Sequence, residues 1–410
     1  MKYVIVIADG MADGPVEELH GRTPLEHVDL PHFNVLAGAG LGCVRTIPIG
    51  LPAGSDTAIL SILGYDPRIY YQGRSSLEAA GYGIALGSDD VSLRVNLVTL
   101  TGDDFASARI VSHNSGDIGA EEADRLIASL DKNAEYAAAA RELRLSLAAG
   151  HGFRRVGVIH GASDIEAGAI ALTEPHSILG RQIEPYLPGG ALAQELTRCM
   201  DASYRCLREH PVNKARDINA KPPANCLWPW GAGKATALQS FRRQHRVRAA
   251  AISAVPLVMG IAELGGMRVL RLAGATGGLD TDFKGKAMCA LDALASDADL
   301  AIIHIEAPDE CAHEGDVKGK CEALRRIDGD VVATLLDDLG KITPAFRILL
   351  ISDHYTRLCT RSHDDTPVPY CVYDSRTPMP ARKFTENAAS SAPVLEEGHY
   401  LLSLLLERIG

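Results

Sequence analysis

Four short runs of apolar, mostly β-branched residues stand out along the chain, and polar groups follow each of them. They are residues 3–8 before Asp9, 268–272 before a Gly-Ala-Thr-Gly stretch, 300–305 before Glu306, and 347–351 before Asp353 and His354. Continuous apolar runs of this length predict strands buried on both faces, as in a mainly parallel sheet. Helical patterns lie between them, for example at residues 285–295 and 317–339. We therefore expect an α/β fold whose site lies beyond the carboxyl ends of the strands.

The middle of the chain has a different pattern, which predicts an inserted domain. Residues 91–100 resemble a strand, and residues 120–149 have helical spacing and are rich in Ala, Glu, Arg and Leu. Three of the four apolar runs come after residue 265, so the N-terminal strand must join a sheet completed from the far end of the sequence. We expect a catalytic domain of residues 1–75 and 240–410, interrupted by a smaller α+β domain of residues 76–239, an ordinary size for one domain.

Composition and charge narrow the class of protein. With 46% hydrophobic and 23% charged residues, the 410-residue chain fits a compact globular protein. A formal net charge of -11 argues against a nucleic-acid partner. No apolar run approaches the ~20 residues that span a bilayer, so no membrane partner is expected. The N-terminal residues do not have the pattern of a signal peptide, and the nine cysteines are scattered without a Cys-x-x-Cys pair. We expect a cytoplasmic enzyme with reduced thiols.

Acidic and imidazole side chains gather at the predicted strand ends and are candidates for metal ligands. They are Asp9, Asp309, His313, Asp353, His354 and His363. Asp309 and His313 are four residues apart, which puts both on one face of a helical turn. This donor set suits Mn²⁺, Zn²⁺ or Mg²⁺, and two such ions ~3.5–4 Å apart can clamp an in-line phosphoryl displacement. Taken singly, Asp9 also fits a polar turn, and Asp309 with His313 also fits an exposed helix pair.

Ser55 is the candidate nucleophile. It stands in Gly54-Ser55-Asp56-Thr57, directly before a helical pattern at residues 58–63. Amides and the positive end of the dipole at a helix N-terminus can hold a phosphate beside such a serine. A serine before Asp and Thr also fits an ordinary N-cap. There is no Gly-x-Ser-x-Gly elbow, which disfavours an acyl hydrolase.

The order of these motifs resembles that of the cofactor-independent phosphoglycerate mutases. The matching motifs are Asp9-Gly10, Gly54-Ser55-Asp56, Ala307-Pro308-Asp309-Glu310 with His313, Ser352-Asp353-His354, and His363 with Pro367-Val368-Pro369. More narrowly, the chain is similar to the shorter archaeal-type branch, within the alkaline phosphatase superfamily. The resemblance covers essentially the whole chain. It implies an alkaline-phosphatase-like, mainly parallel sheet flanked by helices, with the inserted domain acting as a substrate-binding lid.

The resemblance also implies the chemistry of the site. Two divalent metal ions are expected, Mn²⁺ first, with Mg²⁺, Zn²⁺ or Co²⁺ as alternatives. Asp9, Ser55, Asp353 and His354 would bind one ion, and Asp309, His313 and His363 the other. Ser55 would take the phosphoryl group of 3-phosphoglycerate as a phosphoserine, and the bound glycerate would accept it back on its other hydroxyl to give 2-phosphoglycerate. Lys286 would help to activate Ser55 and stabilise the phosphoryl oxygens, while the closed lid excludes water.

The small phosphorylated substrate should be held by arginines through bidentate contacts. The candidates are Arg74, Arg94 and Arg181, with His176 nearby; each arginine also fits an ordinary salt bridge. The archaeal branch usually has an Asp-Arg-x-Ala-Gly-Arg-like segment where residues 112–117 read Ser-His-Asn-Ser-Gly-Asp. The change removes two cations, which leaves open a related phosphotransferase or phosphatase acting on another ester, including a homoserine-kinase-like role. The oligomeric state is left open.

Overall fold

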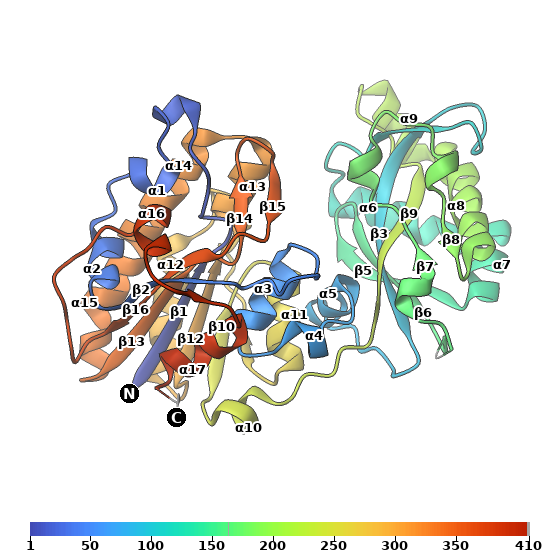
Figure 1. Ribbon diagram of the computed structural model, residues 1–410. Helices are drawn as coiled ribbons and strands as arrows, with labels where there is room; N and C mark the ends of the chain where they lie inside the picture. The colour runs from blue at the N-terminus through green and yellow to red at the C-terminus, as the bar shows by residue number, and fades with distance from the viewer. Residues whose placement is uncertain (163, 408–410) are drawn as a thin grey trace. The chain divides into compact units, whose positions relative to one another are not determined.

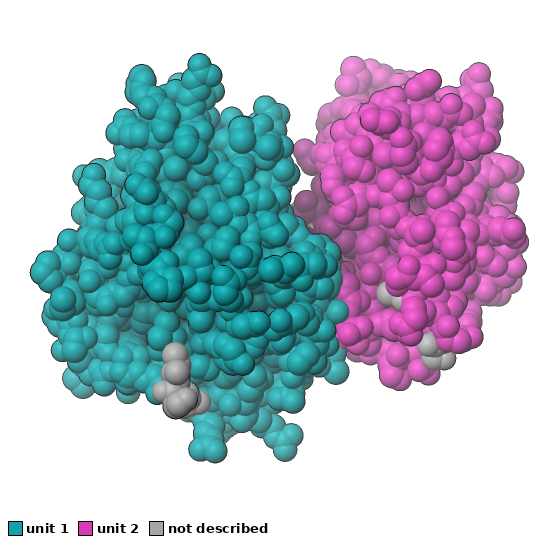
Figure 2. Space-filling view, viewed as in Figure 1, with its two compact units in different colours: residues 1–71, 237–410 teal, residues 72–236 magenta. Residues whose placement is uncertain are grey.

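The computed structural model describes residues 1–162 and 164–407, which divide into two compact units (Figures 1 and 2). The described parts of Met1–Tyr71 and Ala237–Gly410 form unit 1, and those of Gln72–Thr236 form unit 2. The boundaries expected from the sequence lie after residues 75 and 239. Within the described ranges, none of the helices is both long and apolar enough to cross a membrane.

A mainly parallel sheet forms the centre of unit 1. Its strands follow the order β11-β10-β12-β1-β13-β16-β2-β17. The bounds are β1 Lys2–Ala8, β2 Leu41–Val44, β10 Ala249–Ile252, β11 Arg268–Leu270, β12 Leu300–Ile305, β13 Phe346–Ile351, β16 Val368–Asp374 and β17 Val394–Leu395; a separate hairpin pairs β14 Tyr355–Arg357 with β15 Ser362–Asp364. The first five strands in this order run parallel, and β16 is antiparallel to its neighbours. The predicted fold class is confirmed, and β1 does join strands from the far end of the chain.

Helices cover both faces of this sheet (Figure 1). The helices of unit 1 are α1 Pro24–His27, α2 Pro31–Gly40, α3 Ser55–Ile62, α4 Pro67–Tyr70, α10 Phe241–His245, α11 Pro256–Leu264, α12 Phe283–Ala295, α13 Ala307–Glu314, α14 Val317–Arg326, α15 Ala333–Ile342, α16 Glu386–Ser390 and α17 Leu401–Leu405. On one face, Val4, Val6 and Ala8 of β1 pack into a core with α2, α12, α14 and α15. On the other face, α11 packs against β10 and β11, and α17 packs against β13. Helices on both faces explain why β1, β12 and β13 are almost entirely apolar.

Three sequence expectations for individual elements need correction. The run at 268–272 becomes β11, a three-residue strand at the edge of the sheet with exposed and half-buried residues, so it is not buried on both faces. The neighbouring strand β10 reads Ala-Ala-Ala-Ile, a composition without a strand signal, and was not predicted. Residues 120–149 do not stay helical throughout, because the segment from Leu145 onward pairs with β6 as a strand.

Unit 2 combines an antiparallel sheet with helices. Its elements are β3 Val91–Thr101, β4 Arg109–Ser112, β5 Leu145–His151, β6 Arg154–Ile159, β7 Ile170–Ala171, β8 Gly189–Gly190, β9 Cys226–Lys234, α5 Arg74–Gly81, α6 Ala120–Leu130, α7 Ala134–Leu143, α8 Ala193–Arg208 and α9 Pro211–Ile218. The central strand β3 pairs with β4, β6 and β9. Alternate residues of β3, from Val91 to Leu97, pack against residues of α6 and α8.

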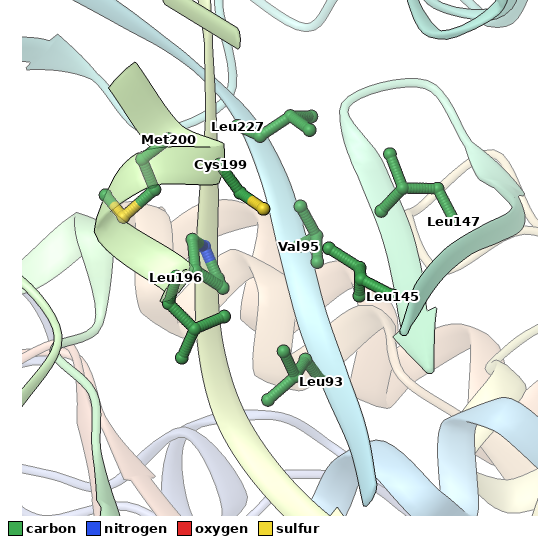
Figure 3. A pocket seen from close by; sticks show the side chains of 9 residues that line it. Leu93, Val95, Leu145, Leu147, Leu196, Cys199, Met200 and Leu227 are labelled. Atoms are coloured by element: carbon green, nitrogen blue, oxygen red, sulfur yellow. The ribbon is translucent and has the colours of Figure 1, made fainter. Parts of the chain in front are cut away.

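A small cavity interrupts the core of unit 2 (Figure 3). Its volume is about 10 Å³, and it is lined by Leu93, Val95, Leu145, Leu147, Leu196, Cys199, Met200, Leu227 and Pro229. Such a space holds a single water at most, and its lining offers almost no polar partner to one. The cavity is therefore a packing defect and not a ligand site.

Candidate active site

Three neighbouring parallel strands of unit 1 bring predicted ligands together beyond their carboxyl ends. Strand β1 lies between β12 and β13, and Asp9 follows β1 directly. Ile7 pairs with Ile351, so Asp9 and Asp353 each lie two residues beyond paired positions. On the other side Ala8 pairs with Ile305, and helix α13, which carries Asp309, begins two residues later. The shared register brings residues that are some 300 positions apart to one place.

A tight turn after β1 makes room for this convergence. Gly10 has a positive φ of 60°, a conformation that costs glycine little. A Cβ at this position would lie 2.5 Å from Thr356 Oγ1 and 2.7 Å from Asp309 Oδ1. Gly10 also donates its backbone N–H to Asp353 Oδ1 at 3.0 Å. The glycine of the Asp9-Gly10 motif thus permits the close approach of the two other acidic residues.

One group of candidate ligands surrounds Nε2 of His354, which is fully buried. Ser55 Oγ lies 3.0 Å from this nitrogen. Asp353 Oδ2 lies 3.2 Å from it, and Asp9 Oδ1 lies 3.6 Å from it. Thr356 Oγ1 is 3.0 Å from the other ring nitrogen, Nδ1. Two carboxylates, one imidazole and one hydroxyl therefore share a single small volume.

The burial and the missing hydrogen bonds of these carboxylates are what a cation site requires. Within residues 1–162 and 164–407, Asp9 Oδ1 and Asp353 Oδ2 are buried without a hydrogen-bond partner. An unpartnered buried charge is costly unless a cation neutralises it. Burial raises the pKa of Asp9 well above its ordinary value, and the charges of Asp353 and Asp309 raise it further. Two orphaned oxygens that face the same imidazole nitrogen fit a divalent ion bound by hard oxygen and nitrogen donors.

The second group consists of Asp309, His313 and His363. His313 Nε2 lies 3.2 Å from Asp309 Oδ2, and His363 Nε2 lies 3.4 Å from Asp309 Oδ1. Burial alone would raise the pKa of Asp309, but hydrogen bonds with the two histidines hold it well below its usual range. The same carboxylate raises the pKa of His313 to about 9. These three residues can hold a metal ion together, and Asp309 is buried, so the exposed-pair alternative is wrong.

The two groups adjoin each other. The rings of His354 and His363 are stacked with their centroids 3.9 Å apart. Asp309 also lies close enough to Asp9 and His354 for one donor atom of each to fall within 4.8 Å of the others. The arrangement can accommodate two cations side by side, with Asp309 near both.

Ser55 is the first residue of α3, and the N-cap is Gly54. The alternative that Ser55 is an ordinary N-cap is therefore wrong. The contact of its hydroxyl with His354 Nε2 points it to the first group of ligands. Asp56, the next residue, accepts a hydrogen bond from Tyr71 Oη at 2.8 Å. The helix N-terminus thus presents a buried hydroxyl beside two carboxylates.

Lys286 enters the site region from α12 and is 1% exposed. Its Nζ donates to the backbone oxygen of His304 at 3.1 Å, and the Nε2 atom of His304 lies 2.9 Å from Asp9 Oδ2. Burial lowers the pKa of Lys286 to about 8 and that of His304 to about 3. His304 was not predicted as a site residue, although it is the one polar residue in the apolar run 300–305, which signals a buried side chain that needs partners.

A buried hydrogen-bond network holds Asp309 of the second group in place. Its members were not predicted from the sequence either. Thr356 donates its hydroxyl to Asp309 Oδ1 at 2.5 Å. Lys320, which is fully buried, donates to the backbone oxygen of Thr356 at 2.7 Å and to Asp13 Oδ2 at 2.6 Å. Burial lowers the pKa of Lys320, and the charge of Asp13 opposes this effect. No local pattern distinguishes Lys320 from the other lysines of an amphipathic helix.

In unit 2 the structure brings three of the four substrate-binding candidates together. Arg74 Nε and Arg94 Nε lie 2.8 Å and 2.9 Å from the two carboxylate oxygens of Glu78. The Arg94 guanidinium stacks on Trp230, with Cζ 3.8 Å from the ring centroid. His176 meets the same tryptophan edge-on, at a centroid distance of 5.5 Å. This cluster can present cations and a ring nitrogen to an anionic molecule.

Arg181 does not take part in those contacts. It is exposed, and its Nη1 donates to Tyr186 Oη at 3.2 Å. His113, from the altered segment 112–117, instead lies beside His176, with ring centroids 6.2 Å apart. Asn96 links the two halves of the cluster, because its Nδ2 donates to the backbone oxygen of His113 and its Oδ1 accepts from Trp230 Nε1. The segment that lacks the expected arginines thus still places an imidazole next to the candidate residues.

Comparison with known proteins gives one consistent family. The sequence profile described as 2,3-bisphosphoglycerate-independent phosphoglycerate mutase matches residues 37–213. A protein of that name from Methanosarcina barkeri is 40% identical over 99% of this chain and 100% of its own length. The solved structure of a Pyrococcus horikoshii protein is 31% identical, with a TM-score of 0.78, and covers 99% of this chain and 97% of its own. A cofactor-independent phosphoglycerate mutase from Thermoplasma acidophilum is 26% identical, with a TM-score of 0.61 and full coverage of both chains.

Proposed function

The chain belongs to the archaeal-type branch of the 2,3-bisphosphoglycerate-independent phosphoglycerate mutases, and we propose that it interconverts 3-phosphoglycerate and 2-phosphoglycerate through a phosphoserine on Ser55. The observation that carries the serine's role is the 3.0 Å contact of its Oγ with His354, at the edge where Asp9 and Asp353 converge. At this position the neighbouring side chains orient the hydroxyl, and the charged groups around it can activate it as a nucleophile.

Two divalent cations, with Mn²⁺ as the proposed metal and Mg²⁺, Zn²⁺ or Co²⁺ as alternatives, would complete the site. Asp9, Ser55, Asp353 and His354 would hold one, and Asp309, His313 and His363 the other. When bound, the cations would supply positive charge that favours loss of the serine proton and offsets charge on the phosphoryl oxygens. The orphaned oxygens of Asp9 and Asp353 support this assignment.

The reaction then consists of two transfers to and from one residue. Ser55 Oγ attacks the phosphorus of 3-phosphoglycerate and gives up its proton. The bond from phosphorus to O3 of the glycerate breaks, and O3 takes up a proton to become a hydroxyl. The glycerate stays bound and turns, and its O2 hydroxyl attacks the phosphoserine and gives up its proton. The bond from phosphorus to Oγ breaks, and Oγ takes up a proton to become the serine hydroxyl again. Water must be kept out in between, because its attack on the phosphoserine would release phosphate.

We propose that unit 2 binds the anionic ends of the substrate and acts as the lid. Arg74, Arg94 and His176 are the proposed contacts, and the shared Glu78 fixes the first two in place. Burial alone would raise the pKa of Glu78, but the charges of Arg94 and Arg74 keep it below its ordinary value, so Glu78 stays ionised as their counterion. Arg181 is the fourth proposed contact, and it would have to leave its present partner, Tyr186, to reach the substrate.

The activity can be tested in an assay coupled to enolase. With Mn²⁺ and no added 2,3-bisphosphoglycerate, the purified protein should convert 3-phosphoglycerate to 2-phosphoglycerate. A protein that instead releases phosphate, or transfers phosphoryl groups only with other small esters, would support the alternative activity, including the homoserine-kinase-like one. The segment 112–117 favours that alternative, since Asn114 and Asp117 bond to each other and no arginine occurs there.

The pKa of Lys286 predicts how kcat changes with pH. With a pKa of about 8, its ammonium group is charged below that pH and neutral above it. If this charge stabilises the phosphoryl oxygens, kcat should fall as the pH rises through about 8. In Lys286→Arg the fall should move to higher pH, because a guanidinium keeps its proton. Rates measured on both sides of pH 8 check this.

The matched control is Lys284→Arg, an exposed lysine on the same helix. Its alkaline profile should equal that of the wild type. A fall near pH 8 that Lys286→Arg leaves in place would show that another group titrates.

We place the protein in the cytoplasm. All nine cysteines are free thiols, and eight of the nine are buried or half-buried without pairing, which suits a reducing compartment.

A further inference from the structure

His304 makes a contact that no step above uses. The residue lies on β12, between β1 and β10, and its side chain is 1% exposed. Its Nε2 lies 2.9 Å from Asp9 Oδ2, and its Nδ1 lies 3.2 Å from Ser253 Oγ. Ile252 pairs with Ile303, so Ser253 follows β10 directly opposite His304. The imidazole therefore bridges two neighbouring strand ends.

The groups around the ring favour one tautomer of His304. Ser253 Oγ accepts the backbone N–H of Val255 at 3.0 Å, at the start of α11. Its own proton is then available to Nδ1 of His304, which accepts it. A neutral imidazole has one N–H, which in this arrangement belongs to Nε2 and donates to the Asp9 carboxylate. The backbone oxygen of His304 is held in turn by Lys286 Nζ at 3.1 Å.

This bond distinguishes the two oxygens of Asp9. Oδ2 is occupied by His304, whereas Oδ1 is buried without a hydrogen-bond partner among the described residues and points to His354 Nε2. A carboxylate that is free to rotate would have to be ordered each time a cation binds. Groups that orient ligands in this way affect metal affinity strongly.

We propose that His304 is a positioning residue that holds Asp9 with Oδ1 directed at the cation, and that Ser253 sets its tautomer. The inference rests on the two-metal centre of the proposed function. It assigns His304 no contact with substrate. Its role is to raise the affinity of one of the two metal positions, the one that contains Asp9.

The test compares Mn²⁺ binding, measured by calorimetry on the chelator-treated full chain, in three variants. His304→Leu fills the space without a donor and should weaken one of the two Mn²⁺ affinities by ~10–100-fold. His304→Gln keeps an N–H₂ group near the position of Nε2 and should restore much of the loss. Ser253→Ala leaves the imidazole in place but removes the partner that sets its tautomer, and should fall between the wild type and His304→Leu.

The matched control is His245→Leu, since His245 is also buried in unit 1 but lies tilted against the ring of Phe241 and belongs to neither ligand group. It should leave both affinities at the wild-type values. Wild-type affinity in His304→Leu, an equal loss at both positions, or no difference between the Leu and Gln variants would overturn the proposal. If His304→Leu does not fold, as judged by thermal unfolding, unchanged Mn²⁺ affinities in both Ser253→Ala and His304→Gln would overturn it.

Activity separates this inference from the proposed function. For a positioning role, an excess of Mn²⁺ should return the kcat of His304→Leu towards the wild-type value, with the KM for 3-phosphoglycerate unchanged. A kcat that stays low at saturating Mn²⁺ would contradict positioning. A wild-type protein that binds two Mn²⁺ ions without mutase activity would refute the proposed function and leave the role of His304 standing.

Discussion

Replacement of Ser55 by alanine should lower mutase turnover by on the order of 10⁴-fold or more, because it removes the proposed nucleophile, the hydroxyl that contacts His354 Nε2. Asp9, Asp353 and His354 remain in the variant, so its content of bound metal should change little. Turnover is measured in the enolase-coupled assay, and metal content by elemental analysis of the dialysed protein. The combination of lost turnover and retained metal separates a nucleophile from a residue that only holds a cation.

Ser61→Ala is the matched control. Ser61 is on the same helix and is 1% exposed, but it belongs to no ligand group. Its variant should keep turnover close to that of the wild type. Substantial activity in Ser55→Ala would exclude Ser55 as the nucleophile.

Removal of the divalent cations should abolish activity and also destabilise unit 1. Without them Asp9 and Asp353 keep orphaned buried oxygens beside Asp309, and the repulsion between these acids is not compensated. Returning Mn²⁺ to a hundredfold excess over its Kd should stabilise the folded state by about 2.7 kcal/mol for each site. Thermal unfolding with and without Mn²⁺, together with the coupled assay, measures both effects.

Lowering the pH should weaken Mn²⁺ binding, which the same thermal-unfolding experiment measures. Protonated imidazole does not bind a cation, so the gain from Mn²⁺ should shrink as the pH falls through the histidine range. The control is Asp309→Asn, which should show a smaller Mn²⁺ gain at every pH. A stabilisation by Mn²⁺ that is the same in wild type and variant would place the cation elsewhere.

The strands of the sheet could be predicted where burial on both faces requires a continuous run of apolar residues. β1, β12 and β13 are covered on both faces, and their apolar runs show it. β10 could not be predicted, because a row of small alanines, which lets helices pack closely, has no strand preference of its own. β2 and β17 at the far edge are short and owe their form to pairing with neighbours. Their conformation is set by tertiary contacts and not by local propensity.

The candidate site was predictable to the extent that its residues stand at element ends. Asp9 and Asp353 follow strands, and Ser55 begins a helix, so each could be named from its position in the pattern. His304 and Lys320 lie inside elements, so the pattern along the chain does not show which groups their side chains contact. Only the register of β12 against β1, and the packing of α14 beneath Thr356, reveal what they touch.

The central place of β1 has a consequence for how the protein is made. This apolar strand leaves the ribosome before both strands that bond to its edges, β12 and β13, which are synthesised some 300 residues later. Unit 2 is continuous in sequence and can fold before the partner strands of β1 have been synthesised. During that interval an unpaired hydrophobic edge is open to association with other chains. Assembly of unit 1 therefore depends on contacts of high sequence separation, which form slowly, and the cation site cannot exist before the last of them closes.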